Sequence, residues 1–332
     1  WWLSTFGYNY DADLPALCHG HLAGTLSPEA TETYHTLVEK ASNAPVQDYT
    51  AFASDYLNVF TTGFHYAFGV AIIAMVISLT IYLLNKRNFP DPSKKAVASS
   101  ASSATVEMSI QEVKQRMYAL FAVFGVVIFF WFSFHQNGMS LSFFARDFVD
   151  SSAVAPEVWQ AINPFFVIVL TPMIMAIFGF LARRGKEIST PRKIAIGMFI
   201  AGLAFLFLAV FSIMKGYPSA DAFRGLPIAE QMAAKAHWWV LIVTYFFLTV
   251  AELFISPLGL SFVSKVAPKS MLGLCQGLWL AATALGNLLL WIGPLMYNSW
   301  PIWQCWSVFL IVCLVSMGVM LGMVKWLERV TK

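Results

Sequence analysis

Four polar side chains recur on one face of a strongly apolar segment, and one of them is charged. Tyr245, Thr249, Glu252 and Ser256 are separated by four, three and four residues, which places them on one side of an α-helix. A charge at the centre of a membrane costs about 2.5–3.5 kcal/mol, so a carboxylate kept there usually binds a cation or moves a proton. Glu252 is therefore the first candidate site residue. The alternative is a structural acid paired with a base on another helix.

A second polar stripe lies in the next apolar segment. At helical spacing it contains Gln276, Trp279, Thr283 and Asn287. Gly273, Gly277 and Gly286 would allow neighbouring helices to approach closely. Such polar residues either line a cavity or hydrogen-bond to adjacent helices, and the spacing leaves both interpretations open.

Prolines accompany two of the candidate positions. Pro164 and Pro172 lie in the segment that contains Asn163, and Pro257 and Gly259 follow the Glu252 stripe. Because proline removes a backbone donor, we expect broken helices at these points. Broken helices at membrane depth are tolerated only beside protein or a cavity, and they commonly build transport sites.

A histidine ends another apolar segment and could carry a proton. His135 lies four residues after Trp131, in the run WFSFHQNG. An interfacial residue and a proton relay are both open interpretations. The sequence has no Ser/His/Asp set, HExxH helix, CxxC pair or phosphate-binding glycine loop, so we predict no enzyme, no cofactor and no metal site.

The composition indicates which elements position these residues. The 332-residue chain is 58% hydrophobic and 12% charged, with a mean hydropathy of +0.66. Soluble domains carry about twice that share of charge, so a soluble or disordered protein is excluded. A net charge of +3 also gives no electrostatic surface for nucleic acid.

Seven apolar segments are long enough to span a lipid bilayer, at residues 64–84, 118–136, 158–181, 194–214, 239–263, 272–297 and 303–326. The sequence thus predicts an all-α membrane protein with seven transmembrane helices.

Loop charge predicts the orientation of these spans. Sixteen of the 21 basic residues lie in one alternating set of loops, which the positive-inside rule assigns to the cytoplasm. We therefore expect a multi-pass protein of the cell (inner) membrane, with residues 1–62 outside and the C-terminus inside.

The segments that flank the first span are polar. Residues 1–63 carry a net charge of −6, which a solvated acidic surface explains. Ser27, Pro28 and Glu29 predict a helix start, and apolar residues from 46 to 59 predict a second, short amphipathic helix before the first span. Residues 85–117 indicate a flexible linker that ends in a capping box at Ser109 and Glu112.

Several stretches resemble the proton-dependent oligopeptide transporter (POT) family, a branch of the major facilitator superfamily. The most specific match is AELFISPLGLS at residues 251–261, which resembles the family's tenth helix. GFHYAFG at 63–69, FWFSFHQNG at 130–138, QAINP at 160–164 and GLW to GNL at 277–288 resemble its sixth, seventh, eighth and eleventh helices. GFLARRGK at 179–186 resembles the superfamily's cytoplasmic loop motif, with Ala182 in place of an acid.

The resemblance implies the C-terminal part of a twelve-helix major facilitator fold. The seven spans become helices six to twelve, so the N-terminal helices of the same protein are expected to precede Trp1. The implied organisation is an acidic insertion at 1–62, helix six at 63–84, a cytoplasmic linker at 85–117 and a six-helix bundle at 118–332. The implied activity is proton-coupled import of di- and tripeptides by alternating access.

The resemblance also implies which residues of this chain form the transport site. Glu252 matches the acid that binds the peptide amino terminus, and Asn163 matches an asparagine of the same pocket. Trp279 and Thr283 match lining positions on the eleventh helix, and Trp131 matches one on the seventh. His135 departs from the family, which generally has a gating glutamate there. A proton could instead be carried by imidazole, whose ordinary pKa is about 6.5.

Two other classes of protein remain open. A seven-helix receptor or light sensor has the same topology, although a retinal protein needs a lysine deep in its last helix and Lys325 lies near the end of that segment. A carrier relative that acts as a membrane scaffold or partner protein is the third interpretation, with the acidic segment as its contact surface.

Overall fold

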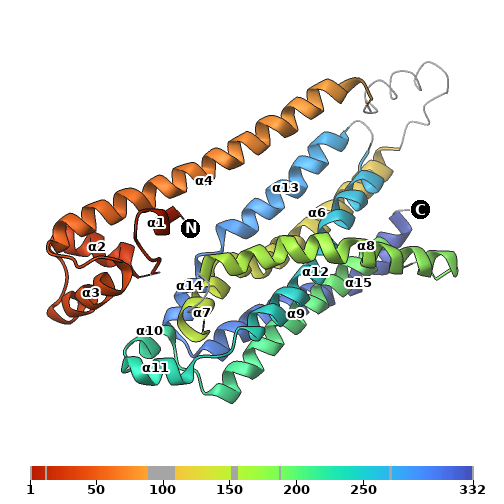
Figure 1. Ribbon diagram of the computed structural model, residues 1–332. Coiled ribbons are helices and arrows are strands. Elements are labelled where there is room, and N and C mark those ends of the chain that lie inside the picture. Colours follow the sequence, from red (N-terminus) through yellow and green to blue (C-terminus); the bar gives the residue numbers. More distant parts are fainter. Residues whose placement is uncertain are drawn as a thin grey trace. The chain divides into compact units, whose positions relative to one another are not determined.

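The computed structural model describes residues 2–11, 13–88, 109–150, 156–186, 188–268 and 271–330 (Figure 1). Seven of its helical segments are long and apolar enough to cross a membrane, which confirms the predicted all-α class and span count. The chain divides into two units, Trp1–Glu107 and Met108–Lys332. Residues 89–108 of the predicted linker lie outside the described residues.

The first unit is built on one long helix. Three short helices, α1 (Trp2–Thr5), α2 (Leu14–Ala23) and α3 (Pro28–Ala41), pack against the beginning of α4 (Tyr49–Asn85). Their shared core includes Leu14, Tyr34, Val38 and Tyr56, all fully buried. As predicted, α3 begins after Ser27, whose Oγ accepts a hydrogen bond from Ala30 N at 3.3 Å.

The amphipathic segment predicted before the first span is not a separate short helix. It forms the first turns of α4, where Phe52, Tyr56 and Val59 are buried, and the helix continues unbroken into the span. The predicted domain boundary after residue 62 therefore lies inside α4. A short η1 turn (Lys86–Asn88) follows the helix.

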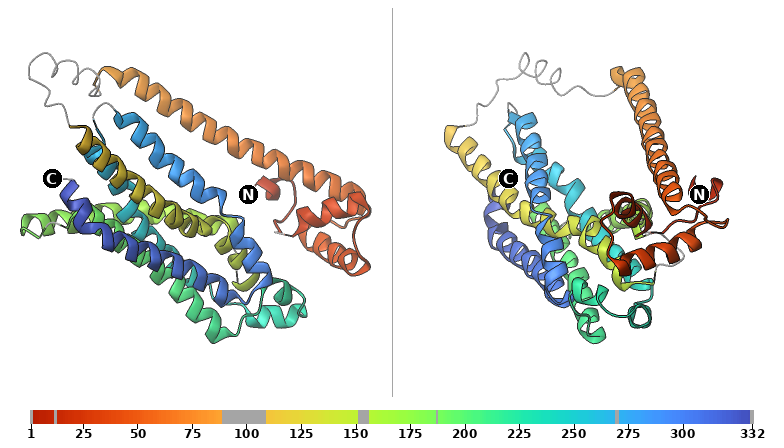
Figure 2. Two further views of the ribbon diagram at one scale, coloured as in Figure 1. Left: turned by 180° about the vertical axis from the view of Figure 1, so that it is seen from behind. Right: turned by 90° about the vertical axis from the view of Figure 1, so that its left-hand side faces the viewer.

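The second unit is a bundle of helices. In chain order its elements are α6 (Ile110–Phe134), η2 (His135–Gly138), α7 (Ser140–Phe148), η3 (Pro156–Ala161), α8 (Ile162–Arg183), α9 (Thr190–Lys215), α10 (Ala220–Arg224), α11 (Ile228–Ala234), α12 (Trp239–Val266), α13 (Leu272–Leu288), α14 (Ile292–Ser299) and α15 (Ile302–Val330). Helices α12 and α15 pack along α9, and α6 packs against α13 and α15. Figures 1 and 2 show α7, α10, α11 and α14 gathered at one end of this bundle.

Helices approach one another closely at glycine residues. A Cβ on Gly197 of α9 would lie 2.7 Å from Ile255 and 3.0 Å from the carbonyl of Ala251, both on α12. A Cβ on Gly286 of α13 would lie 2.7 Å from the carbonyl of Ile128 on α6. Gly286 therefore has the predicted role in close packing, whereas Gly273 and Gly277 have no such neighbour within 4 Å.

The helix breaks are not where the prolines predicted them. Pro172 lies inside a continuous α8 and Pro257 inside a continuous α12, so the expected interruptions there are wrong. Pro164 is in the first turn of α8, where no intrahelical donor is required. Among the described spans, the breaks fall instead at η2, between α6 and α7, and at residues 289–291, between α13 and α14.

The predicted capping box at the start of α6 is half formed. Ser109 Oγ accepts a hydrogen bond from Glu112 N at 3.2 Å. The carboxylate of Glu112 pairs instead with Arg116 one turn later, at 2.9 Å.

The start of α4 offers a local test of the fold. Asp48 Oδ1 accepts hydrogen bonds from Thr50 N at 2.8 Å and Ala51 N at 3.0 Å. Asp48→Ala should destabilise this helix end by about 1 kcal/mol and speed hydrogen exchange of these two amides by roughly fivefold. Asp48→Asn, which keeps the acceptor, should show a smaller effect. Equal exchange in wild type and Asp48→Ala would contradict the assigned cap.

Candidate functional site

An asparagine joins the charged face of α12 to α8. Asn163 Nδ2 donates to Glu252 Oε2 at 3.1 Å, and Asn163 Oδ1 accepts from Thr249 Oγ1 at 2.8 Å. With the opposite amide orientation, Asn163 Oδ1 would face the carboxylate oxygen of Glu252. The hydrogen-bond network therefore sets the orientation of the Asn163 side chain. The predicted pair Glu252 and Asn163 is therefore in direct contact.

The carboxylate of Glu252 is only partly satisfied. Glu252 is half-buried, and within the described parts of the chain no Lys, Arg or His forms an ion pair with it. A carboxylate can accept several hydrogen bonds, and Asn163 supplies a neutral donor without a counter-charge. The arrangement can accept a cation or hold a proton.

Tyr245 extends the same face of α12 toward the break in α6–α7. Its hydroxyl donates to the carbonyl of Asn137 at 3.2 Å, and its side chain is buried. Thr249 Oγ1 also lies 2.7 Å from the Tyr245 carbonyl, so its one hydroxyl hydrogen is shared between that carbonyl and Asn163 Oδ1. The polar stripe predicted on α12 thus connects two neighbouring helical segments, while Ser256, its last member, is half-buried.

Trp279 lies in a notch of α12. A Cβ on Gly259 would lie 2.0 Å from Trp279 Cη2, so only glycine leaves room for the indole. Phe124 of α6 makes an edge contact with the same ring at 6.3 Å between centroids. Gly259 was expected to interrupt the helix, but its observed role is to admit this side chain. Trp279 is 2% exposed, so little of its surface is free to line a cavity.

The other predicted residues occupy separate positions. The Trp131 and His135 rings stack at 4.8 Å with an interplanar angle of 16°. Asn287 of α13 is the hydrogen-bonding neighbour of the His135 side chain. Thr283 Oγ1 donates to the Trp279 carbonyl of its own helix at 3.3 Å. Among the described contacts, none joins Trp131, His135 or Thr283 directly to Glu252.

Sequence reasoning missed a second acid and the residues around it. Asp147 on α7 is 8% exposed and contacts Arg146, Arg224 and Tyr297. It lies beyond the end of the apolar run, where a charge looks like a solvated loop residue. The adjacent Arg146 and Asp147 were the available signal, although their distant partners were not visible in the sequence.

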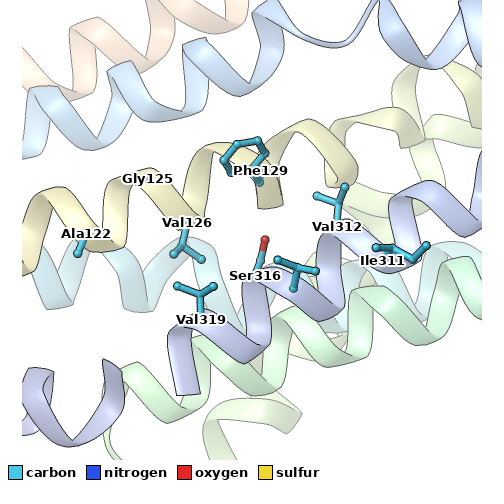
Figure 3. Close-up of a pocket in the computed structure, with 9 residues that line it drawn as sticks. Ala122, Gly125, Val126, Phe129, Ile311, Val312, Ser316 and Val319 are labelled. Atoms are coloured by element: carbon cyan, nitrogen blue, oxygen red, sulfur yellow. The ribbon is translucent and has the colours of Figure 1, made fainter. Parts of the chain in front are cut away.

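An apolar groove of about 450 Å³ lies between α6 and α15 (Figure 3). Its lining is formed by Ala122, Gly125, Val126, Phe129, Ile311, Val312, Val315, Ser316 and Val319. None of the predicted site residues lines it. The groove is therefore distinct from the Glu252 site.

The fold and the polar site together define a class of protein. A crystal structure of a POT peptide transporter aligns with a TM-score of 0.56 at 18% identity, covering 96% of this chain and 65% of that one. A POT family transporter in complex with 5-aminolevulinic acid aligns with a TM-score of 0.51 at 17% identity, covering 96% and 66%. The fold is therefore that of the major facilitator carriers.

Sequence comparison identifies the family within this class. Residues 93–298 match the POT family, and the chain belongs to it. Dipeptide and tripeptide permease B of Salmonella typhimurium is 31% identical over 180 residues, which are 53% of this chain and 34% of that protein. The permease B of Shigella dysenteriae is 30% identical over 233 residues, or 65% and 44%. The chain thus spans less than half the length of these two relatives. The family consists of transporters, in agreement with the expectation of a carrier and not an enzyme.

The packing of Trp279 against Gly259 can be tested directly. Gly259→Ala should displace the indole and destabilise the α12–α13 contact by about 1–3 kcal/mol, because the added methyl overlaps the ring. Difference absorption or fluorescence of the protein should report the change in the tryptophan environment. Gly277→Ala is the matched control, since its Cβ would meet no atom within 4 Å. Identical spectra and stability for the two variants would contradict the notch.

Proposed function

We propose that the protein is a proton-coupled symporter that imports di- and tripeptides by alternating access. The observation that carries this proposal is Glu252, a carboxylate within a membrane-spanning helix that is held by Asn163 and has no cationic partner in the described chain. Such a group suits the ammonium end of a peptide. Family membership and the permease relatives support the same substrate class.

Recognition would depend on the parts that all small peptides share. Glu252 would pair with the ammonium group, and Asn163 would contribute hydrogen bonds to the adjoining backbone. Trp279 and Trp131 are almost fully buried, so they would support the wall of the site from behind, with Thr283 nearby on α13. A site that contacts invariant termini strongly and side chains weakly can accept many sequences.

The complete carrier would contain more helices than this chain. Within its own unit, the apolar window of α4 buries none of its residues, as expected for a helix whose neighbours lie elsewhere. Coverage of only 34–44% of the two permeases supports N-terminal helices of the same protein as the other half. In this arrangement, residues 1–62 form an outer acidic insertion, 63–84 helix six, 85–117 a cytoplasmic linker and 118–332 the C-terminal bundle. The carrier would lie in the inner membrane with its C-terminus in the cytoplasm.

Proton coupling would involve Glu252 and His135. Imidazole changes its charge between about pH 5 and 8 when unperturbed, so it can replace a carboxylate as a proton carrier without being a permanent anion. The stacked Trp131 and the neighbouring Asn287 hold His135 in place. One face of the ring is thereby covered, while its Nδ1 is buried and has no hydrogen-bond partner among the described residues.

The role of Glu252 can be tested with paired substrates. Glu252→Gln should lower the affinity for a dipeptide with a free amino terminus by about 10–100-fold, because a buried charge partner of the ammonium is lost. The affinity for the N-acetylated dipeptide should change little. Competition against labelled dipeptide uptake measures both values, and Glu230→Gln, at an exposed acid on α11, is the control. A wild-type preference for the free amine in Glu252→Gln would rule out the assigned contact.

The role of His135 can be tested by the pH profile. Uptake by the wild type should rise as the pH is lowered, because more imidazole is protonated and available to deliver its proton. His135→Gln keeps a polar side chain of similar reach and should flatten this rise. Initial rates, normalised to the protein in the membrane, provide the measurement. If His135→Gln follows the wild-type profile, His135 is not part of the coupling.

A further inference from the structure

The two helix breaks of the bundle are joined by one buried amide. Pro294, in the first turn of α14, has no N–H to bond the carbonyl of Leu290 four residues earlier, and that carbonyl accepts a hydrogen bond from Gly293 N at 3.1 Å instead. Gln136 Nε2, from the break between α6 and α7, donates to that carbonyl at 3.2 Å. Gln136 Oε1 accepts from Ser140 Oγ in the first turn of α7 at 2.7 Å. The side chain of Gln136 therefore satisfies backbone and hydroxyl groups on both breaks at once.

The contact between the breaks is close as well as polar. A Cβ on Gly293 would lie 2.1 Å from Gln136 Oε1 and 2.6 Å from Ser140 Oγ. Gln136 and Ser140 are fully buried, so neither can exchange its partner for water. Movement of one helix at its break must be accommodated at the other.

Beyond the breaks, Asp147 ties three helices together. Its carboxylate pairs with Arg146 Nε at 2.9 Å and with Arg224 of α10 at 2.8 Å. The hydroxyl of Tyr297 on α14 donates to it at 3.1 Å. A buried carboxylate with two guanidinium partners and a phenol has its charge balanced and its acceptors largely filled.

The same end of the bundle is fixed to the remaining helices. Ala236 N donates to the Phe148 carbonyl at 2.7 Å, which joins the end of α7 to the segment before α12. Phe144 of α7 makes an edge contact with Trp306 of α15 at 5.7 Å. Helices α7, α10 and α14, which we call the end cap, are thus anchored on several sides.

We propose that the end cap stays rigid during transport, with Gln136 as the pivot about which α6 and α13 change their angle to it. Asp147 is the anchor of the cap. The proposal rests on the proposed alternating access, because only a carrier that changes conformation needs a pivot. Gln136 and Asp147 are both positioning residues. Gln136 acts through the helix breaks, and Asp147 acts through the helices that it joins. The α6–α13 pair is itself held together at Gly286.

Spin-label distances in the complete carrier can measure both parts of this arrangement. Exposed Leu274 on α13 and Ser299 on α14 lie on either side of one break and report the bend. Exposed Ala222 on α10 and Ser299 report the cap. The cysteines at positions 18, 275, 305 and 313 are buried, so labels at introduced cysteines can be selective. A dipeptide should shift the 274–299 distribution and leave the 222–299 distribution unchanged.

The variants test the two positioning residues by distance distributions measured without substrate and by uptake kinetics. Gln136→Leu should broaden the 274–299 distribution and lower the maximal uptake rate per molecule by about tenfold with little change in KM. Gln111→Leu, at an exposed position of α6, is the matched control. Asp147→Asn should broaden the 222–299 distribution, and Tyr297→Phe, which removes one hydrogen bond, should do so less.

The outcomes separate this inference from the proposed function. An unchanged 274–299 distribution in Gln136→Leu, or a peptide-induced shift within the cap as large as that across the break, would overturn the pivot. Broadening in both variants with no response to any dipeptide would support the pivot and count against peptide transport.

Discussion

A carboxylate can be kept within a membrane span only where neighbouring groups hold it, and here a single asparagine does so. Asn163 donates to Glu252 and accepts from Thr249, so one amide is attached to two successive turns of α12. The rest of the α8–α12 contact is apolar and includes Leu170, Ile174 and Leu253. Apolar surfaces slide past one another with little directional preference, whereas two hydrogen bonds of fixed geometry define one register. The position of α8, and hence the shape of the site, depends on this interaction.

Glycines determine how closely the helices around this site can pack. Lipid tails are as apolar as leucine, so helices in a bilayer gain stability from close contact and hydrogen bonds more than from the hydrophobic effect. Gly197, Gly259, Gly286 and Gly293 each lie where a Cβ would overlap a neighbouring segment. Two of these contacts admit a large side chain, Trp279 at Gly259 and Gln136 at Gly293. Close packing and the placement of polar groups are therefore parts of one arrangement.

Much of the fold could be predicted from the sequence, because long apolar runs have one stable solution in a bilayer. The seven spans follow from hydropathy, the helix start at Ser27 from its cap, and the proximity of Asn163 and Glu252 agrees with the single pocket that the resemblance implies. The breaks could not be located from proline alone. Pro257 and Pro172 are accommodated within helices, whereas Pro294 accompanies a break that another helix supports through Gln136. Gln136, which donates to the Leu290 carbonyl at that break, lies 154 residues away in the sequence, so proline alone could not locate the break.

Asp147 and Glu252 differ in their partners, and the difference separates a structural acid from one that is available for chemistry. Asp147 has two guanidinium groups and a phenol as partners, so removing it would take away the carboxylate that these groups share, and binding another cation would require breaking those contacts. Glu252 has one neutral amide and no ion pair among the described residues. Only 12% of the residues are charged, so a carboxylate within a span is uncommon in this protein. Because the saturated acid fixes helices to one another, its contacts need not change in a transport cycle. Glu252, the unsaturated acid, is the one whose electrostatic free energy would fall on binding a cation, and it lies on the helix that Asn163 holds in register.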